Sequence, residues 1–181
     1  MAHMDTTELR SKAYNILSDT RQLKSKTVSM QKICSHEGIK VIDSKNYDLE
    51  DYNTLGRVSY TGKIFQIVVN NTLSPVEQRV EEAVLYAYVK LNGHTLVDRW
   101  AKEKLPNGRV WAARHKRDSE EWERYTLFAQ YILLGSFIGK ERKIVQDKNA
   151  LKHIHKYAHQ KKVSTEFLVQ YLTREAAKKV N

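Results

Sequence analysis

The stretch 67–93, which reads IVVNNTLSPVEQRVEEAVLYAYVKLNG, decides the fold of this chain. It opens inside a run of mostly apolar, β-branched side chains that extends from Ile64 to Val69 and stops at Asn70 and Asn71. A short run of this kind, bounded by asparagines, is typical of a strand. We therefore expect a strand over 64–69 that leads directly into a helix.

The helix after this strand has a well-marked start. Ser74 precedes Pro75, which stands where a missing N–H costs nothing, and Glu77 follows three residues after the serine. This spacing predicts a capping box. Apolar residues then recur at steps of three and four, which predicts a buried face. They are Val76, Val80, Ala83, Val84, Ala87, Tyr88 and Leu91. We expect the helix to end at Gly93, because glycine readily adopts the left-handed conformation that ends many helices.

The rest of the chain predicts a small α+β fold. The expected elements are helices over 5–25 and 28–36, a strand over 38–43, strands 58–60 and 64–69 around the turn Thr61-Gly62-Lys63, a helix over 120–134 capped by Asp118 or Ser119, and two helices over 140–181 hinged near Lys162. This order predicts a small antiparallel sheet packed against the core helix. We expect one α+β domain over 5–139 and a basic helical segment over 140–181 packed on the same domain.

The composition bounds the function. The chain has 181 residues, 41% of them hydrophobic and 29% charged, enough to enclose a core in one globular domain. No apolar run reaches the roughly 18 residues of a membrane span, and no secretory signal is recognisable. Cys34 is the one cysteine, so an internal disulfide is excluded. A soluble protein of the reducing cytoplasm is expected, without membrane contact.

A net charge of +10 favours an acidic partner. The densest basic segment is 99–117, in which two tryptophans interrupt the cations. Its candidate binding residues are Arg99, Trp100, Lys102, Lys104, Arg109, Trp111, Arg114, Lys116 and Arg117. Arginine and lysine can neutralise phosphates or carboxylates, while tryptophan can stack on a base or anchor a protein interface. As an alternative, the tryptophans anchor the segment to the body and the charges form a solvated surface.

The central stretch resembles the ImmA/IrrE-type zinc metallopeptidases. In that family a strand ends in asparagine, a short turn with Ser or Pro follows, and Gln-Arg opens a helix that carries the zinc-binding His-Glu-x-x-His. Aligned without a gap from Gln78-Arg79, the metal-site positions fall on Val84, Leu85 and Tyr88. Val84 and Leu85 can supply neither a zinc ligand nor a general base.

The second half of the family's metal site is lost as well. There the third ligand is a glutamate on a later helix, in a pattern like Glu-x-Glu-Ala-Asn-x-Phe-Ala-Ala. Residues 122–135 read WERYTLFAQYILLG, and Phe128-Ala129 aligns without a gap, so the two glutamate positions carry Trp122 and Arg124. The resemblance implies a zincin-like architecture in which the catalytic positions are degenerate. We expect no enzyme activity, no metal and no cofactor.

Two patterns near the C-terminus suggest other sites. His153, His155 and His159 have a spacing that can chelate a metal on a helix, but the lysines around them oppose a dication, so we interpret this face as solvated. The stretch 151–172 resembles a helix-turn-helix, with Val163-Ser164 in the turn. Its other matching positions are Ala158 in the first helix and Leu168 and Tyr171 in the second, while Lys162 stands where a small turn residue is usual.

The residues and the resemblance predict a pseudoenzyme, a non-catalytic regulator that binds a protein partner. The resemblance implies a repressor or a host defence protein as the partner, and an origin in a phage or other mobile element. One alternative is a regulator that binds DNA or RNA directly through 99–117 and the C-terminal helices. Another is an unusual zinc peptidase. The oligomeric state and the identity of the partner do not follow from the sequence.

Overall fold

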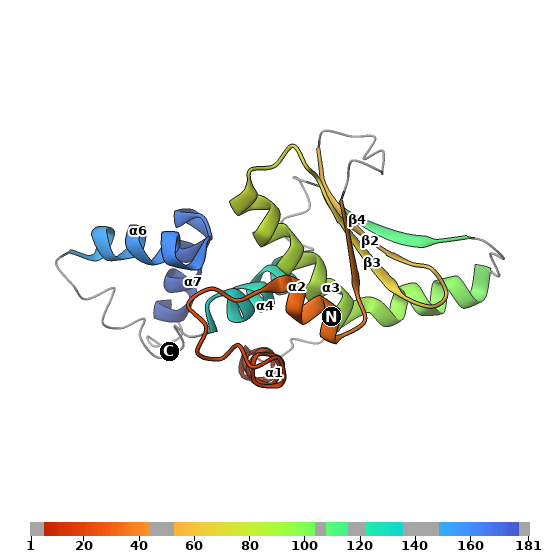
Figure 1. The fold of residues 1–181 in the computed structure, drawn as a ribbon, viewed down its shortest axis with the longest axis horizontal. Helices are drawn as coiled ribbons and strands as arrows, with labels where there is room; N and C mark the ends of the chain where they lie inside the picture. Colours follow the sequence, from red (N-terminus) through yellow and green to blue (C-terminus); the bar gives the residue numbers. More distant parts are fainter. Residues whose placement is uncertain (1–5, 44–52, 104–107, 116–121, 136–148, 178–181) are drawn as a thin grey trace. The chain divides into compact units, whose positions relative to one another are not determined.

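The computed structural model describes residues 6–43, 53–103, 108–115, 122–135 and 149–177. These residues form a mixed α+β fold of six helices and one four-stranded sheet (Figure 1). They group into two units, one over Met30–Ala129 and the other over Met1–Ser29 together with Gln130–Asn181. None of the described helices combines the length and apolar character that a bilayer crossing requires. The division into segments 5–139 and 140–181 stays a prediction.

The unit over 30–129 contains the sheet. Its strands are β1 (Lys40–Asp43), β2 (Thr54–Tyr60), β3 (Phe65–Val69) and β4 (Val110–His115), in the order β1-β3-β2-β4. As expected, β2 and β3 form a hairpin around Gly62, whose φ of +84° suits glycine. The sheet is not purely antiparallel, because β1 pairs with β3 in parallel. The antiparallel prediction was therefore wrong for β1. The residue pattern of a strand does not determine whether it pairs in parallel or in antiparallel fashion.

Strand β4 was not predicted. It pairs with β2 in antiparallel fashion, from Tyr60 opposite Val110 to Thr54 opposite His115, and forms one edge of the sheet. Its sequence VWAARH has no simple alternation of apolar and polar residues, because Ala112 and Ala113 stand side by side. Among the described residues of the segment 99–117, residues 99–103 form the end of a helix and residues 110–115 form this strand.

Helix α3 (Pro75–Glu103) crosses one face of the sheet and packs on β2, β3 and β4 (Figure 1). Its predicted start is confirmed, because the Ser74 amide donates to Glu77 Oε2 (2.8 Å) and the Glu77 amide donates to Ser74 Oγ (3.3 Å). Gly93 does not end the helix, contrary to prediction. It is a buried residue in the middle of α3, and a Cβ at this position would stand 3.0 Å from the ring of Phe65 on β3. Close helix-to-strand packing explains this glycine.

Helix α2 (Met30–His36) lies before β1 and packs on both β1 and α3. It ends at His36, shortly before Gly38, which has a φ of +68°, and the Ile39 amide donates to the Cys34 carbonyl oxygen at 2.8 Å. Six consecutive residues of α3, from Ala83 to Tyr88, are buried. A helix that is buried on all sides in its central turns places those turns at the core of this unit.

The second unit is helical. It contains α1 (Thr6–Asp19), α6 (Ala150–Lys161), α7 (Thr165–Ala177) and the last turns of α4 (Glu123–Leu133). The predicted hinge near Lys162 is confirmed, since this residue is left-handed with a φ of 52°. Helix α4 begins later than predicted, and the proposed caps Asp118 and Ser119 lie outside the described residues.

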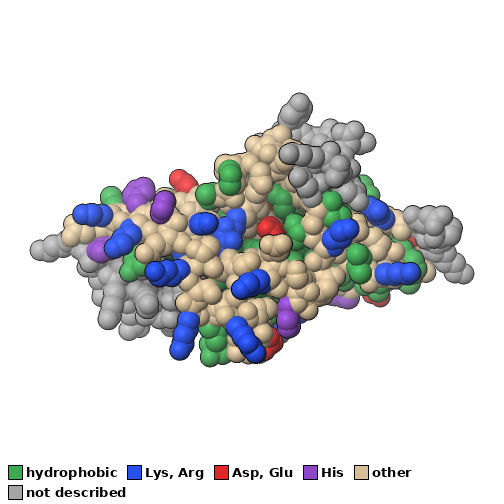
Figure 2. Space-filling model, viewed as in Figure 1, with side chains coloured by type: hydrophobic (Ala, Val, Ile, Leu, Met, Phe, Trp, Pro, Cys, Tyr) green, Lys and Arg blue, Asp and Glu red, His purple; other side chains and the backbone are tan. Residues whose placement is uncertain are grey.

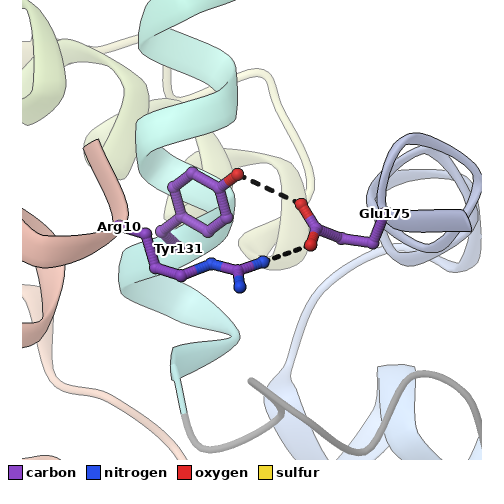
Figure 3. Close-up of polar contacts among 3 residues, drawn as sticks. All are labelled: Arg10, Tyr131 and Glu175. Atoms are coloured by element: carbon purple, nitrogen blue, oxygen red, sulfur yellow. Dashed lines mark hydrogen bonds and ion pairs between the residues drawn. The ribbon is translucent and has the colours of Figure 1, made fainter. Parts of the chain in front are cut away.

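A buried polar cluster joins three helices of this unit (Figure 3). Arg10 of α1 forms an ion pair with Glu175 of α7, and the Tyr131 hydroxyl of α4 donates to the other carboxylate oxygen of Glu175 at 3.1 Å. The Arg10 guanidinium also lies over the Tyr131 ring, 5.3 Å from its centroid. Glu175 is only 4% exposed, and its contacts with Arg10 and Tyr131 help to offset the cost of its burial.

Candidate functional site

The positions aligned with the family's zinc-binding helix lie in the core. Val84 and Leu85 are fully buried, and Tyr88 is 8% exposed. Leu85 packs against β2 so closely that a Cβ on Gly56 would stand 2.7 Å from its Cδ1 atom. Full burial of side chains such as Val84 and Leu85 stabilises the fold by roughly 1.5–3 kcal/mol each. These apolar positions stabilise the fold and offer no ligand to a metal.

Tyr88 packs in an aromatic cluster against Trp122, one of the two positions aligned with the family's glutamates. The two rings are stacked, with centroids 5.0 Å apart and an interplanar angle of 22°. Tyr125 of α4 completes the cluster, with its centroid 5.2 Å from that of Tyr88 and 5.3 Å from that of Trp122. Trp122 and Tyr125 are 3% and 6% exposed. The structure thus brings one position aligned with a metal-binding histidine, Tyr88, into contact with one aligned with a glutamate, Trp122, and the two are joined by their aromatic rings.

A buried ion pair lies beside this cluster. Arg114 of β4 donates to Glu81 of α3, and its guanidinium also lies over the Trp122 ring, 5.9 Å from the centroid. Glu81 is 3% exposed, and burial raises its pKa to about 7, although the nearby Arg114 acts in the opposite direction. This hydrogen-bonded contact, next to the stacked rings, ties the edge strand to the core helix.

Arg124, the other position aligned with a glutamate, contacts Tyr125 and Leu91. Its guanidinium lies over the Tyr125 ring at 4.8 Å from the centroid, and it donates to the Leu91 carbonyl oxygen at 3.4 Å. Arginine carries only donors and a fixed positive charge, so it opposes a metal ion at this place. The cluster can therefore bind neither zinc nor the water that zinc would activate.

The C-terminal histidines do not converge on a common point. His153 lies near the ring of Tyr157, while His155 Nδ1 is 3.4 Å from the Thr165 hydroxyl. Over the described part of the chain, no group of three or more His, Cys, Asp or Glu side chains is arranged to hold a metal ion.

The basic segment separates into exposed and anchored residues. Arg99, Lys102, Arg109 and Trp111 are exposed. Arg99 shares an i, i+4 ion pair with Glu103 (2.6 Å) on α3. Arg114 is anchored by Glu81, as described above. The remaining cations predicted here, Lys104, Lys116 and Arg117, lie outside the described residues.

The two tryptophans of this segment play different parts. The Trp100 indole N–H donates to the Gly108 carbonyl oxygen at 3.2 Å, and its ring packs so tightly on the hairpin turn that a Cβ on Gly62 would overlap it. Trp111 is 53% exposed on the edge strand. Side chains alternate along a strand, and Arg114 reaches α3, so Trp111 points away from α3. Trp100 is therefore an anchor and Trp111 a contact residue.

A separate open pocket of about 660 Å³ lies between α2, β1 and α3. Cys34 lies in its wall, but this thiol is 1% exposed and burial raises its pKa to about 12. Burial likewise raises the pKa of Glu82, although Arg79 acts in the opposite direction. A protonated, buried thiol is a poor nucleophile, which argues against catalysis by this residue.

Glu81 is not among the residues predicted from the sequence. It stands between Val80 and Glu82 in a charged first half of the helix, where a solvated side chain is the ordinary expectation. One signal could have found it, because Glu81 lies three and four residues before Val84 and Leu85 and so shares their side of the helix.

Comparison with protein-family models, with characterised protein sequences and with solved structures gave no match for this chain.

Proposed function

We propose that this chain is a non-catalytic binding protein built on an inactivated metallopeptidase-like fold, and that it controls a protein partner. The stack of Tyr88 on Trp122 carries the proposal. Two positions far apart in the sequence, which the alignment makes metal ligands, come into contact, as a common ancestral site requires. Both are aromatic, so the site retains its place in the fold without its chemistry.

The proposed contact surface consists of Arg99, Lys102, Arg109 and Trp111. These side chains are exposed at the end of α3 and along β4. Exposed tryptophan and arginine are the residues that most often dominate protein interfaces, and cations favour an acidic partner. Arg114 is left out of this surface, because its side chain is only 16% exposed and contacts the buried Glu81. By analogy with the resembled family, the partner is a repressor or a host defence protein and the source a phage or mobile element.

A pull-down from lysate of the native host tests this function. The bait is the full chain, and the washes are done with and without nuclease. The test variant combines Trp111→Ala with Arg109→Ser. The control variant combines Tyr14→Ala with Lys12→Ser, because Tyr14 is 54% exposed and Lys12 is exposed on α1, a helix that contributes no residue to the proposed surface.

We expect one protein to be retained by wild type and control after nuclease, and to bind the test variant at least about tenfold more weakly once it is purified. Equal binding by all three baits would show that Trp111 and Arg109 do not contribute to the contact surface. Recovery that disappears with nuclease would show that the bound material was held by nucleic acid.

A further inference from the structure

We infer that α6 and α7 form a helix-turn-helix that binds duplex DNA, with α6 against the phosphate backbone and α7 in the major groove. This binding is a second activity of the chain, separate from the function proposed above. It rests on residues of the helical unit, whereas the protein-binding proposal rests on α3 and β4. Either proposal can therefore fail without the other.

The turn between the helices has the required geometry. Lys162 adopts the left-handed conformation, with φ 52° and ψ 49°, at the place where a helix-turn-helix commonly has glycine. The amides of Lys162 and Val163 donate to the His159 and Ala158 carbonyl oxygens at 3.2 and 3.1 Å. Ser164 Oγ then accepts from the Phe167 amide at 3.1 Å and caps α7. Helix α6 ends at Lys161 and α7 begins at Thr165, so the turn between them has three residues.

The packing residues of the pattern are all buried. Ala158 and Val163 are 3% and 4% exposed, while Leu168 and Tyr171 are fully buried. The Tyr131 ring of α4 meets Tyr171 edge-on, with centroids 6.1 Å apart, and the ion pair of Glu175 with Arg10 fixes the far end of α7 (Figure 3). The helix pair is thus held by the rest of its unit and leaves its outer faces exposed.

Helix α6 carries a positive outer face. Its twelve residues include no acid, and Lys152, His155, Lys156 and His159 are exposed, as is Lys162 after it. Figure 2 shows lysine and histidine side chains gathered over this helix. In a helix-turn-helix the first helix crosses the backbone, where lysines neutralise phosphates and release counterions. The position of the charge therefore matches the role of the first helix.

Helix α7 exposes a face suited to reading bases. Its exposed residues Glu166, Val169, Gln170 and Thr173 recur at steps of three and four. Glutamine can bond adenine at two atoms, the methyl groups of Val169 and Thr173 can contact thymine, and glutamate can accept from cytosine. A helix fits the wide major groove of DNA but not the deep, narrow one of duplex RNA. DNA is therefore the favoured ligand.

The experiment selects binding sequences from a random duplex library with the full chain, and then measures affinity for the selected duplex by fluorescence anisotropy at about 50 to 200 mM salt. Lys152→Ser with Lys156→Ser removes two phosphate contacts. Lys12→Ser with Lys63→Ser removes the same charge elsewhere. Gln170→Ala with Thr173→Ala removes proposed base contacts at exposed positions, where folding is unaffected.

We expect an enriched sequence, and a slope of log affinity against log salt that falls by about 1.8 in the α6 variant but not in its control. The α7 variant should keep its affinity for a scrambled duplex and lose at least about fivefold in preference for the selected one. The inference is overturned if no duplex is bound at about 50 mM salt, if the control variant loses as much as the α6 variant, or if single-stranded RNA or heparin competes as well as the selected duplex.

Discussion

The phenol ring of Tyr88 on α3 stacks on the indole of Trp122, with centroids 5.0 Å apart and planes inclined by 22°. Tyr125 packs against both rings, and the Arg114 guanidinium covers Trp122 from the side of β4. The cluster therefore ties the core helix, the edge strand and the start of α4 together. Its contacts are aromatic ring packing and one cation–π contact.

Replacing the buried Trp122 by alanine should cost far more stability than replacing the exposed Trp111. Trp122 is 3% exposed and Trp111 is 53% exposed. We expect Trp122→Ala to lower the free energy of unfolding by about 3–5 kcal/mol, because it opens a cavity among aromatic rings. Trp111→Ala should change it by no more than about 0.5 kcal/mol. Urea titrations of both variants check this, and similar losses in the two would contradict the buried stack.

The buried carboxylate Glu81 should make the protein less stable as the pH rises. Burial raises its pKa from the ordinary value of 4.5 to about 7, so the native state keeps a proton that the unfolded chain has lost. The free energy of unfolding should therefore fall between about pH 4.5 and about pH 7, by on the order of 3 kcal/mol.

The Glu81→Gln variant isolates this contribution. Its side chain cannot ionise, so the stability of the variant relative to wild type should increase with pH over the same window. Other titrating groups are common to both proteins and cancel in the difference. Urea midpoints at several pH values provide the measurement. A difference that stays constant, or that changes in the opposite direction, would mean that Glu81 is not held in a raised-pKa environment.

Cys34 should be almost inert in the native protein. Its thiol is 1% exposed and burial raises its pKa to about 12, so thiolate is scarce at neutral pH. We expect modification by a disulfide reagent at about pH 8 to be at least about 100-fold slower in native than in urea-unfolded protein. A variant with Cys34→Ser and Ser35→Cys moves the thiol to an exposed neighbour and serves as control. Equal rates for the two native proteins would show that Cys34 is accessible.

The ion pair of Arg10 with Glu175 should stabilise the helical unit more than an exposed pair on the same helix. The Glu175 side chain is 6% exposed, whereas Glu8 and Lys12 form a pair that is about half exposed. Glu175→Ala leaves the Tyr131 hydroxyl without its acceptor and should cost about 2–3 kcal/mol. Glu8→Ala should cost no more than about 0.5 kcal/mol. Thermal unfolding of both variants measures the two losses of stability. Equal losses would contradict a stabilising role of the Arg10–Glu175–Tyr131 cluster.

Local signals in the sequence predicted the elements well. Ser74 and Glu77 fix the start of α3 through bonds between neighbours, and Gly38 and Gly62 provide the positive φ that their turns need. The hinge at Lys162 belongs to the same class. In each case the interacting groups lie within a few residues of one another, so the sequence alone contains the cause.

Features that depend on distant contacts were not predictable in this way. Gly93 lies inside α3, where the ring of Phe65 on β3 leaves little room for a Cβ. The parallel pairing of β1, the strand β4 and the burial of Glu81 against Arg114 likewise depend on partners far along the chain. The basic segment looked uniform in sequence, but Arg114 is paired in the interior while Arg109 is exposed. Which cations can reach a partner is decided by tertiary structure.

The proposal of an inactivated metal site is tested most directly by rebuilding that site. A variant with Val84→His, Tyr88→His and Trp122→Glu restores the three ligand types at the aligned positions. Its control has the same two histidines with Trp111→Glu, which places the carboxylate on the exposed edge strand instead. Metal content is measured after purification without a tag, and cobalt substitution reports the coordination geometry by absorption. We predict one tetrahedral metal per chain in the rebuilt variant, and none in the control or the wild type. A folded rebuilt variant without metal, or stoichiometric zinc in the wild type, would contradict the account.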